Sequence, residues 1–193
     1  MTRGSYHHGD LKAVILAQAA VLVAERGADG VSLRELARAA GVSHAAPAHH
    51  FTDRRGLFSA LAAQGWRMLA AALAESRPEF LDAALAYVQF AVEHPGHYEV
   101  MFDRSLVNPD DPELVAAEAA AGAELASGVG TLDDARAKED PQAAGLAAWS
   151  LVHGFAMLWL NDVIDTDTDA VETARRVARM LFTPGPVEPG SDE

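Results

Sequence analysis

Residues 31–58 read VSLRELARAAGVSHAAPAHHFTDRRGLF and hold two short helical patterns on either side of a glycine. Ser32 and Glu35 have the spacing of a capping box, in which two side chains satisfy backbone N–H groups at the start of a helix. Gly41 is expected to end that helix because glycine turns the chain with the least steric cost. A second helix is expected over residues 44–50. The stretch therefore predicts a helix-turn-helix, whose second helix typically lies in the DNA major groove.

The second helix, expected to be capped by Ser43, carries almost no large apolar side chain before Phe51. Its alanines permit a close approach to DNA, and its histidines offer hydrogen-bond donors or acceptors. Pro47 falls in the first turn or so, where a missing N–H costs least. A surface helical hairpin of an enzyme or scaffold is the alternative for this stretch alone, because helix-turn-helix patterns also occur outside DNA-binding proteins.

The first sixty residues resemble the TetR/AcrR family of bacterial repressors. Two positions depart from the family pattern: Ala48 stands where the family usually has tyrosine, and Arg54 stands where it often has lysine. The missing tyrosine hydroxyl leaves one phosphate contact of the family unassigned, whereas arginine keeps the positive charge. The matching segments are Tyr6-His7-His8-Gly9-Asp10-Leu11, Ala24-Glu25-Arg26-Gly27, Val31-Ser32-Leu33-Arg34-Glu35-Leu36-Ala37, Ala40-Gly41-Val42-Ser43 and His50-Phe51.

The predicted DNA contacts divide into phosphate contacts and base contacts. Serine hydroxyls are expected to bind phosphate, and the resemblance adds His50 and Arg54 in the same role. Ala45 and Ala46 offer methyl groups to thymine, and the remaining histidines are expected to set the base preference. The predicted DNA-binding residues are Ser32, Arg34, Ser43, His44, Ala45, Ala46, His49, His50 and Arg54.

The net charge of −13 over 193 residues at first argues against a DNA-binding protein. Its distribution answers that objection, because residues 1–60 carry seven Lys and Arg against five Asp and Glu, a net charge of +2. The remainder of the chain therefore carries −15. An acidic surface repels phosphate, so only the N-terminal part is expected to face DNA.

The composition predicts an all-α protein. Half of the residues are hydrophobic, alanine dominates and β-branched runs are few, which favours helix over strand. The absence of cysteine excludes disulfides and thiolate metal sites. We find no secretory signal, and the apolar stretches are expected to fall short of a membrane span. We therefore expect a cytoplasmic protein without a membrane partner.

Three parts of the chain are predicted. Residues 1–58 are expected to form a three-helix DNA-binding domain that contains the helix-turn-helix. Residues 59–183 are expected to form a larger helical regulatory and dimerisation domain, entered by a long helix over residues 54–74. Residues 184–193, rich in proline, glycine and acidic side chains, predict a disordered acidic tail.

The penultimate helical pattern, residues 142–161, is apolar nearly all round and must be buried on several sides. The spacing of Trp149, His153 and Gly154 resembles the C-terminal domain of a TetR subgroup named for its Trp, His and Gly residues. That resemblance implies that the last two helices, residues 142–161 and 169–182, pair with those of a second copy in a four-helix dimer interface. The candidate interface residues are Ala147, Leu151, Gly154, Leu158, Val171, Ala174 and Ala178.

Aromatic side chains are spread over the helices of the acidic half, in excess of what a dimer seam needs. Residue by residue, the simplest interpretation is that they form the core. The family resemblance implies instead that this half binds a small ligand. The aromatic side chains indicate that this ligand is largely apolar, and the acidic charge favours a neutral or cationic one, with Tyr87 and His153 as candidate polar contacts. The candidate ligand-binding residues are Tyr87, Phe90, Tyr98, Phe102, Trp149 and His153.

Metal sites and catalytic sites have little support in the sequence. The neighbouring histidines His49 and His50 would point about 100° apart on a helix and could not easily share one metal ion. No nucleophile elbow, zinc-binding HExxH motif or nucleotide-binding glycine loop is present. We therefore expect no metal, no cofactor and no enzymatic activity. The sequence predicts a ligand-responsive, homodimeric repressor of an inverted-repeat operator. The alternative is an all-helical ligand-binding or interaction protein whose DNA binding is weak or lost.

Overall fold

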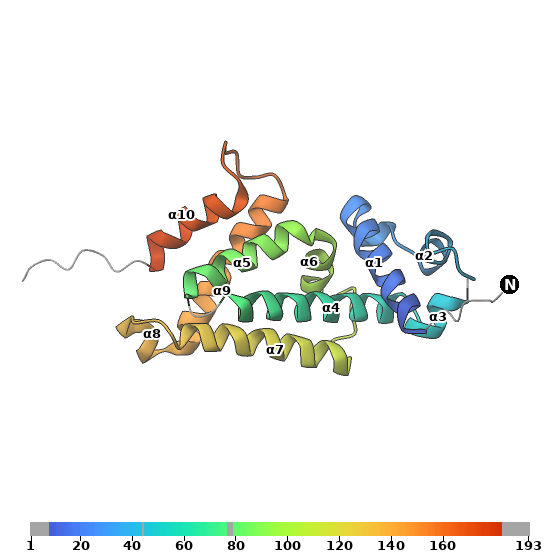
Figure 1. Cartoon of the computed structure of the whole chain (residues 1–193), viewed down its shortest axis with the longest axis horizontal. Coiled ribbons are helices and arrows are strands. Elements are labelled where there is room, and N and C mark those ends of the chain that lie inside the picture. Colours follow the sequence, from blue (N-terminus) through green and yellow to red (C-terminus); the bar gives the residue numbers. More distant parts are fainter. Residues whose placement is uncertain (1–7, 44, 77–78, 183–193) are drawn as a thin grey trace, which may run out of the picture. The chain divides into compact units, whose positions relative to one another are not determined.

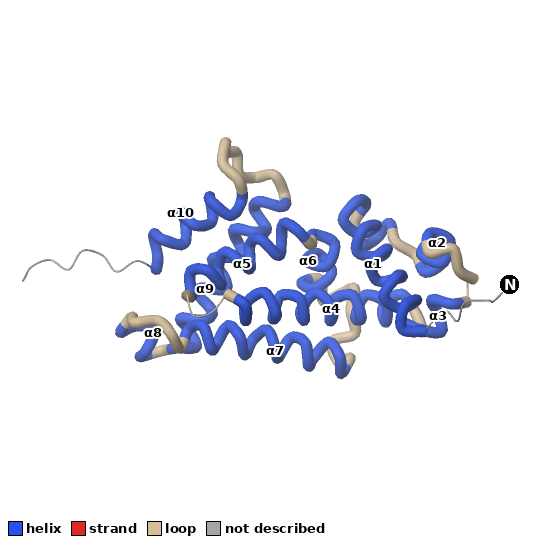
Figure 2. Tube along the Cα trace, viewed as in Figure 1, coloured by secondary structure: helices blue, strands red, loops and turns tan. Residues whose placement is uncertain are grey.

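The computed structural model of the chain describes residues 8–43, 45–76 and 79–182 (Figure 1). These residues form ten α-helices and one short 3₁₀ helix, η1, and they contain no β-strand (Figure 2). The predicted all-α fold is therefore confirmed. The elements are α1 (His8–Arg26), η1 (Ala28–Gly30), α2 (Leu33–Ala39), α3 (Ala46–Phe51), α4 (Arg54–Glu75), α5 (Phe80–Glu93), α6 (Pro95–Phe102), α7 (Pro112–Val129), α8 (Ala135–Glu139), α9 (Pro141–Leu160) and α10 (Ala170–Phe182).

The described residues group into two compact units. The first unit holds residues up to 71 together with 93–122, so it contains α1 to α3, most of α4, α6 and the start of α7. The second unit holds residues 72–92 and those from 123 onward. This division is made by packing and differs from the functional boundary predicted after residue 58, which stays a prediction. The predicted acidic tail lies outside the described residues.

The core of the first unit forms where α1 packs on α6. Ile15, Ala19 and Val23 lie at helical spacing on α1 and are fully buried. Gly96 of α6 permits the close contact, because a Cβ atom added there would lie 2.0 Å from the backbone oxygen of Ala20. No side chain other than hydrogen fits at that position, so the glycine fixes how closely α6 approaches α1.

Helix α4 begins where the sequence predicts. Asp53 caps it by accepting a hydrogen bond from the Gly56 backbone N–H at 2.7 Å. Leu57, Phe58 and Leu61 are fully buried on its inner side. Transfer of such side chains from water stabilises the fold by about 1.5–3 kcal/mol each, so this face anchors the helix that follows the helix-turn-helix.

In the second unit, α9 packs against α10. Asp140 caps α9 by accepting a hydrogen bond from Ala143 N–H at 2.9 Å. Val152, Phe155 and Ala156 form the buried side of α9. A small hollow between α5, α9 and α10 has a volume of about 10 Å³. A space of that size holds at most one water molecule, so this part of the core is closed to an organic ligand.

The opposite side of α9 is apolar and exposed. Leu146, Met157 and Leu158 are 59%, 42% and 48% exposed in the isolated chain.

Among the described helices, α4 and α9 are long and apolar enough to cross a membrane by length and composition, so the prediction that every apolar stretch is too short is wrong. The reason is that alanine and glycine do not interrupt an apolar run. Core helices share these properties, so they do not by themselves indicate a membrane protein.

Candidate nucleic-acid interface

Ser32 starts α2 with half of the predicted capping box. Its side-chain oxygen accepts a hydrogen bond from Glu35 N–H at 3.3 Å. The Glu35 carboxylate does not complete the box in return and instead pairs with Arg26 at 2.8 Å. Because Ser32 is exposed and uses its oxygen as the acceptor, its own O–H remains able to donate to a phosphate.

The turn after α2 follows the prediction, but the second helix begins later than expected. Gly41 has a φ of +67°, in the left-handed region that favours glycine. Ser43 does not cap α3 with its side chain; its backbone oxygen accepts from Ala46 N–H at 3.0 Å. Helix α3 therefore starts at Ala46 rather than at His44, because Pro47 is best accommodated in a first turn. His44 itself lies outside the described residues.

Helix α3 is anchored on one side and open on the other. Pro47 and Phe51 are buried, whereas Ala45, Ala48 and His49 are exposed. Ala46 is half-buried and so offers less methyl surface than predicted. The exposed side is narrow because its residues are small, and it presents the His49 imidazole as its main polar group. This shape suits close approach to the edges of bases.

Two exposed arginines flank this surface on α2. Arg34, which belongs to the predicted set, is exposed, and so is Arg38. The Arg38 side chain is 79% exposed and lies 4.0 Å from Glu35. Arg38 is absent from the predicted set, although its spacing of four residues from Arg34 places both on one side of the helix. Long cationic side chains in this position are suited to phosphate contacts.

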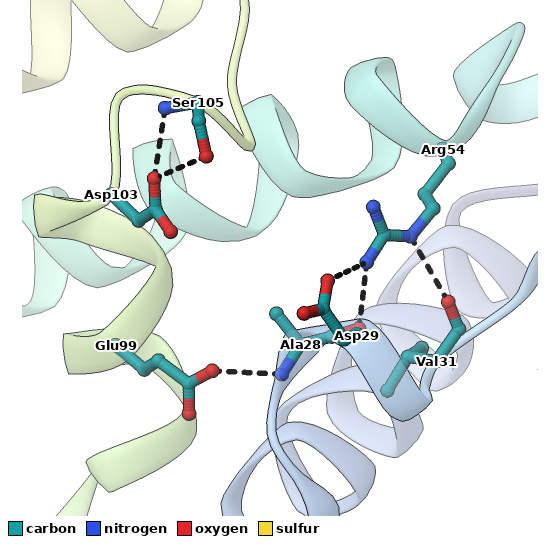
Figure 3. A network of polar contacts seen from close by, with 7 residues as sticks. All are labelled: Ala28, Asp29, Val31, Arg54, Glu99, Asp103 and Ser105. Carbon is teal, nitrogen blue, oxygen red and sulfur yellow. Dashed lines mark hydrogen bonds and ion pairs between the residues drawn. The ribbon is translucent and has the colours of Figure 1, made fainter.

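Arg54 has a different environment from the one predicted by its place in the family pattern (Figure 3). Its Nε donates to the backbone oxygen of Val31 at 3.1 Å, and its Nη2 donates to that of Ala28 at 2.8 Å. The guanidinium also lies 3.6 Å from Asp29 and 4.6 Å from the ring centre of Phe58. These contacts engage two of the three guanidinium nitrogens within the chain, which favours a structural role for Arg54, whose side chain is 40% exposed.

His50 is half-buried and borders an open hollow of about 530 Å³ behind α3. The charged side chains around this hollow are two cations and three carboxylates, so their sum does not favour an anion. One of the cations, Lys12, lies 3.7 Å from Glu113. His50 therefore faces mixed charge on this side. The charged lining residues are Lys12, Arg55, Asp53, Asp111 and Glu113.

The candidate ligand-binding residues form separate groups in the two units. In the second unit, Tyr87 O–H lies 3.0 Å from His153 Nδ1, and Trp149 Nε1 donates to Tyr87 at 3.3 Å. Burial lowers the pKa of His153 below its ordinary value. Phe90, on the same helix as Tyr87, is buried. The polar groups predicted to meet a ligand are thus hydrogen-bonded to one another.

The other two candidates lie in the first unit, on α6. The rings of Tyr98 and Phe102 are 4.8 Å apart, and Trp66 of α4 meets Phe102 edge-on at 5.1 Å. Tyr98 is buried. These contacts are those of a packed aromatic core, which is also the simplest interpretation of these residues in the sequence.

The candidate dimer residues differ in how far they are exposed. Ala147 and Leu158 are exposed, and Leu151 and Gly154 are half-buried on α9. A Cβ atom added at Gly154 would meet nothing within 4 Å among the described residues, so their packing does not explain the mid-helix glycine. On α10, Val171 is half-buried, but Ala174 and Ala178 are buried in the protomer and face its own α5 and α9. Those two alanines support the fold of the single chain.

No three His, Asp or Glu side chains within the described ranges gather closely enough to hold a metal ion. The chemistry of the α2–α3 surface is therefore that of hydrogen-bond donors and arginine cations.

Comparison with known families agrees with this arrangement. Residues 15–61 match the family described as bacterial regulatory proteins, tetR family. Residues 80–181, more than half of the chain, match the family described as tetracyclin repressor-like, C-terminal domain. Neither description names the Trp-His-Gly subgroup, which stays a prediction.

Individual relatives are consistent with these matches. An uncharacterised HTH-type transcriptional regulator of Mycobacterium tuberculosis is 40% identical over 96 residues, which cover 48% of this chain and 42% of that protein. A protein of unknown function from Rhodococcus sp. RHA1 has a TM-score of 0.75 and 33% identity, over 93% of this chain and 97% of its own. AibR, solved in complex with isovaleryl coenzyme A and operator DNA, shares the fold at 18% identity and a TM-score of 0.68, over 91% of this chain and 100% of its own.

The exposed α2–α3 surface, the helical unit that follows it and the two family matches lead to one assignment. The chain belongs to the TetR family of bacterial regulatory proteins.

Proposed function

We propose that this protein is a ligand-responsive transcriptional repressor that binds an inverted-repeat operator as a homodimer in the cytoplasm. The observation that carries the proposal is the exposed surface formed by α2 and α3. There, a buried Phe51 anchors a helix whose outer side presents Ala48 and His49, and the adjoining helix α2 exposes Arg34 and Arg38. The protein acts by binding and not by catalysis.

DNA binding is expected to combine two kinds of interaction. Arg34, Arg38 and the Ser32 hydroxyl bind phosphates and set the orientation, whereas His49 contacts bases. Because all of the excess negative charge lies beyond residue 60, that part of the chain is repelled by DNA and leaves the N-terminal surface to face it.

Selection of bound sites from a random DNA pool is expected to enrich an inverted repeat. Replacing Arg34 and Arg38 with alanine should weaken binding to all sequences and reduce the slope of log K against log salt by roughly 0.9 for each phosphate that is no longer neutralised. His49→Ala should instead change the enriched bases. Arg136→Ala, which removes an exposed arginine of the second unit, serves as the control. Failure of the wild-type protein to enrich any sequence would favour the alternative of a binding protein without a DNA function.

The homodimer is proposed to form through the exposed side of α9. Leu146, Met157 and Leu158 would be removed from water on association, which is the main driving force for such interfaces. A two-fold axis would bring the same surface of both copies together. Gly154, where an added Cβ atom would meet none of the described residues within 4 Å, would then permit the second copy to approach closely.

Gly154→Leu is expected to convert the dimer into a folded monomer. A Cβ atom added at Gly154 would meet none of the described residues within 4 Å, so we expect the cost of the larger side chain to fall on the interface. The matched control is Gly122→Leu, a mid-helix glycine of α7 that is equally open. Light scattering at micromolar concentration should show a dimer for the wild type and the control and a monomer for Gly154→Leu. A dimeric Gly154→Leu variant would place the interface elsewhere.

The ligand is proposed to be small, mostly apolar and not anionic. AibR supports a response to a small molecule, because it has the same fold and was solved with isovaleryl coenzyme A and operator DNA together. In this chain the hollow between α5, α9 and α10 is closed, so a ligand there requires the helices to separate. A thermal-shift screen of apolar compounds, followed by operator titration with each hit, tests the proposal. If no stabilising compound alters operator affinity, a ligand-free repressor is the better description.

A further inference from the structure

A side chain of α6 reaches the short segment that leads into the helix-turn-helix (Figure 3). Glu99 Oε1 accepts a hydrogen bond from Ala28 N–H at 2.7 Å, across 71 positions of the sequence. Ala28 is buried, with 4% of its surface exposed. A buried N–H without an acceptor is destabilising, so this hydrogen bond constrains where η1 lies on α6.

Arg54 holds the same segment from α4. Its Nη2 donates to the Ala28 backbone oxygen at 2.8 Å and its Nε to that of Val31 at 3.1 Å. The Ala28 N–H therefore donates to a side chain of α6, and the Ala28 oxygen accepts from a side chain of α4 and from the Val31 N–H at 3.0 Å. A three-residue 3₁₀ helix forms few hydrogen bonds of its own, so η1 depends on such partners.

The segment held in this way lies directly between α1 and α2. Gly27, which precedes it, has a φ of +75°, and Val31 is followed at once by Ser32, the cap of α2. A displacement of η1 would thus shift the start of α2 and the side chains of Ser32 and Arg34. The hydrogen bond between Glu99 and Ala28 therefore holds in place the segment that precedes the helix-turn-helix.

We propose that Glu99 and Arg54 act as a polar latch that positions the helix-turn-helix for operator binding, without either side chain contacting DNA. Glu99 and Arg54 are then positioning residues, and this inference rests on the proposed function. It assigns Arg54 a role that a lysine cannot reproduce, because only the planar guanidinium donates from two nitrogens to two carbonyls in a fixed geometry.

The latch is tested first without DNA. Hydrogen exchange in peptides covering residues 27–31 should be slow in the wild type and faster in Glu99→Ala. Glu99→Gln keeps an acceptor oxygen and should restore most of the protection. The control is Asp103→Ala, which removes a carboxylate of the same region that bonds only locally to Ser105, at 2.8 and 2.6 Å. Equal protection in the wild type and Glu99→Ala would overturn the latch.

The effect on DNA is measured with the selected operator, after thermal melting has shown that each variant is folded. Glu99→Ala is expected to weaken binding about tenfold, which corresponds to about 1.4 kcal/mol, with an unchanged salt slope because the same phosphates are neutralised. Glu99→Gln should recover most of this affinity, and Asp103→Ala should bind as the wild type does. Unchanged affinity in Glu99→Ala despite faster exchange would overturn the positioning role.

Arg54→Lys separates the latch from a phosphate contact. The latch predicts a reduction in affinity close to that of Glu99→Ala, since lysine keeps the charge but not the two directed hydrogen bonds. Wild-type affinity in Arg54→Lys, combined with a flatter salt slope in Arg54→Ala, would assign Arg54 to the phosphates and overturn the proposal. If the wild type binds no DNA, the proposed function fails, and the exchange experiment still decides whether the latch exists.

Discussion

Replacing Gly96 with alanine is expected to disrupt the packing of α1 on α6 and to abolish measurable operator binding. The added Cβ would lie 2.0 Å from the Ala20 backbone oxygen and 3.0 Å from Ala24 N. Both neighbours are backbone atoms of a helix, so neither moves aside as a flexible side chain would. Overpacking of a well-packed core typically costs about 1–3 kcal/mol and occasionally more, and we expect a loss of stability at the upper end or beyond.

Urea unfolding measures this loss of stability, and a second glycine provides the control. Gly122→Ala should be neutral or stabilise by up to about 1 kcal/mol, because a Cβ there meets nothing and alanine favours helix. The two substitutions add the same methyl group to a helix, so the difference between them reports the local space. Stability of Gly96→Ala equal to that of the control would show that α6 does not approach α1 so closely.

The stability of the protein is expected to fall by about 3 kcal/mol between pH 6.5 and pH 4 because of one histidine, at about 1.4 kcal/mol per pKa unit. His97 is 7% exposed. Burial, assisted by the nearby His94, lowers the pKa of His97 from 6.5 to about 4. The folded chain therefore favours the neutral imidazole, whereas the unfolded chain binds a proton as the pH falls below 6.5. Stability is full above that pH and is lost progressively on acidification.

His97→Gln should remove this part of the pH dependence. Glutamine carries no titratable group and retains an amide for the interaction with Gln64, whose Oε1 lies 3.3 Å from His97 Nε2. Urea unfolding at pH 7, 6 and 5, at one protein concentration, gives the difference in slope between the wild type and the variant. An imidazole of His97 that titrates near pH 6.5 in NMR spectra would contradict the prediction.

The sequence is most informative where one residue type has one physical role. Gly41 adopts a left-handed turn at the end of α2, and α4 begins at Arg54, both as the local pattern predicts. These outcomes depend on interactions between residues that are close along the chain. The family resemblance is confirmed for the same reason, because its motifs consist of such local features.

The sequence is less informative about the hydrogen-bond and ion-pair partners of long side chains, because those partners can be distant along the chain. Glu35 pairs with Arg26 instead of completing the capping box, and Arg54, which the family pattern assigns to a phosphate contact, donates to two backbone carbonyls. The partner of Glu99 is 71 positions away, and no local pattern indicates it. Among the candidate dimer residues, Ala174 and Ala178 face the interior because the amphipathic pattern alone does not distinguish an intramolecular from an intermolecular partner.

The hydrogen bond from Trp149 to Tyr87 gives the protein an intrinsic optical reporter. Trp149 is 36% exposed on α9, and its indole N–H donates to Tyr87 beside the His153 ring. Indole emission shifts to shorter wavelength when water is excluded. Burial of the exposed side of α9 in an interface therefore shifts the emission maximum of Trp149 to shorter wavelength. Only three tryptophans are present, so Trp66→Phe and Trp159→Phe together leave Trp149 as the sole emitter. Association at α9 can then be followed by fluorescence, without attaching a dye.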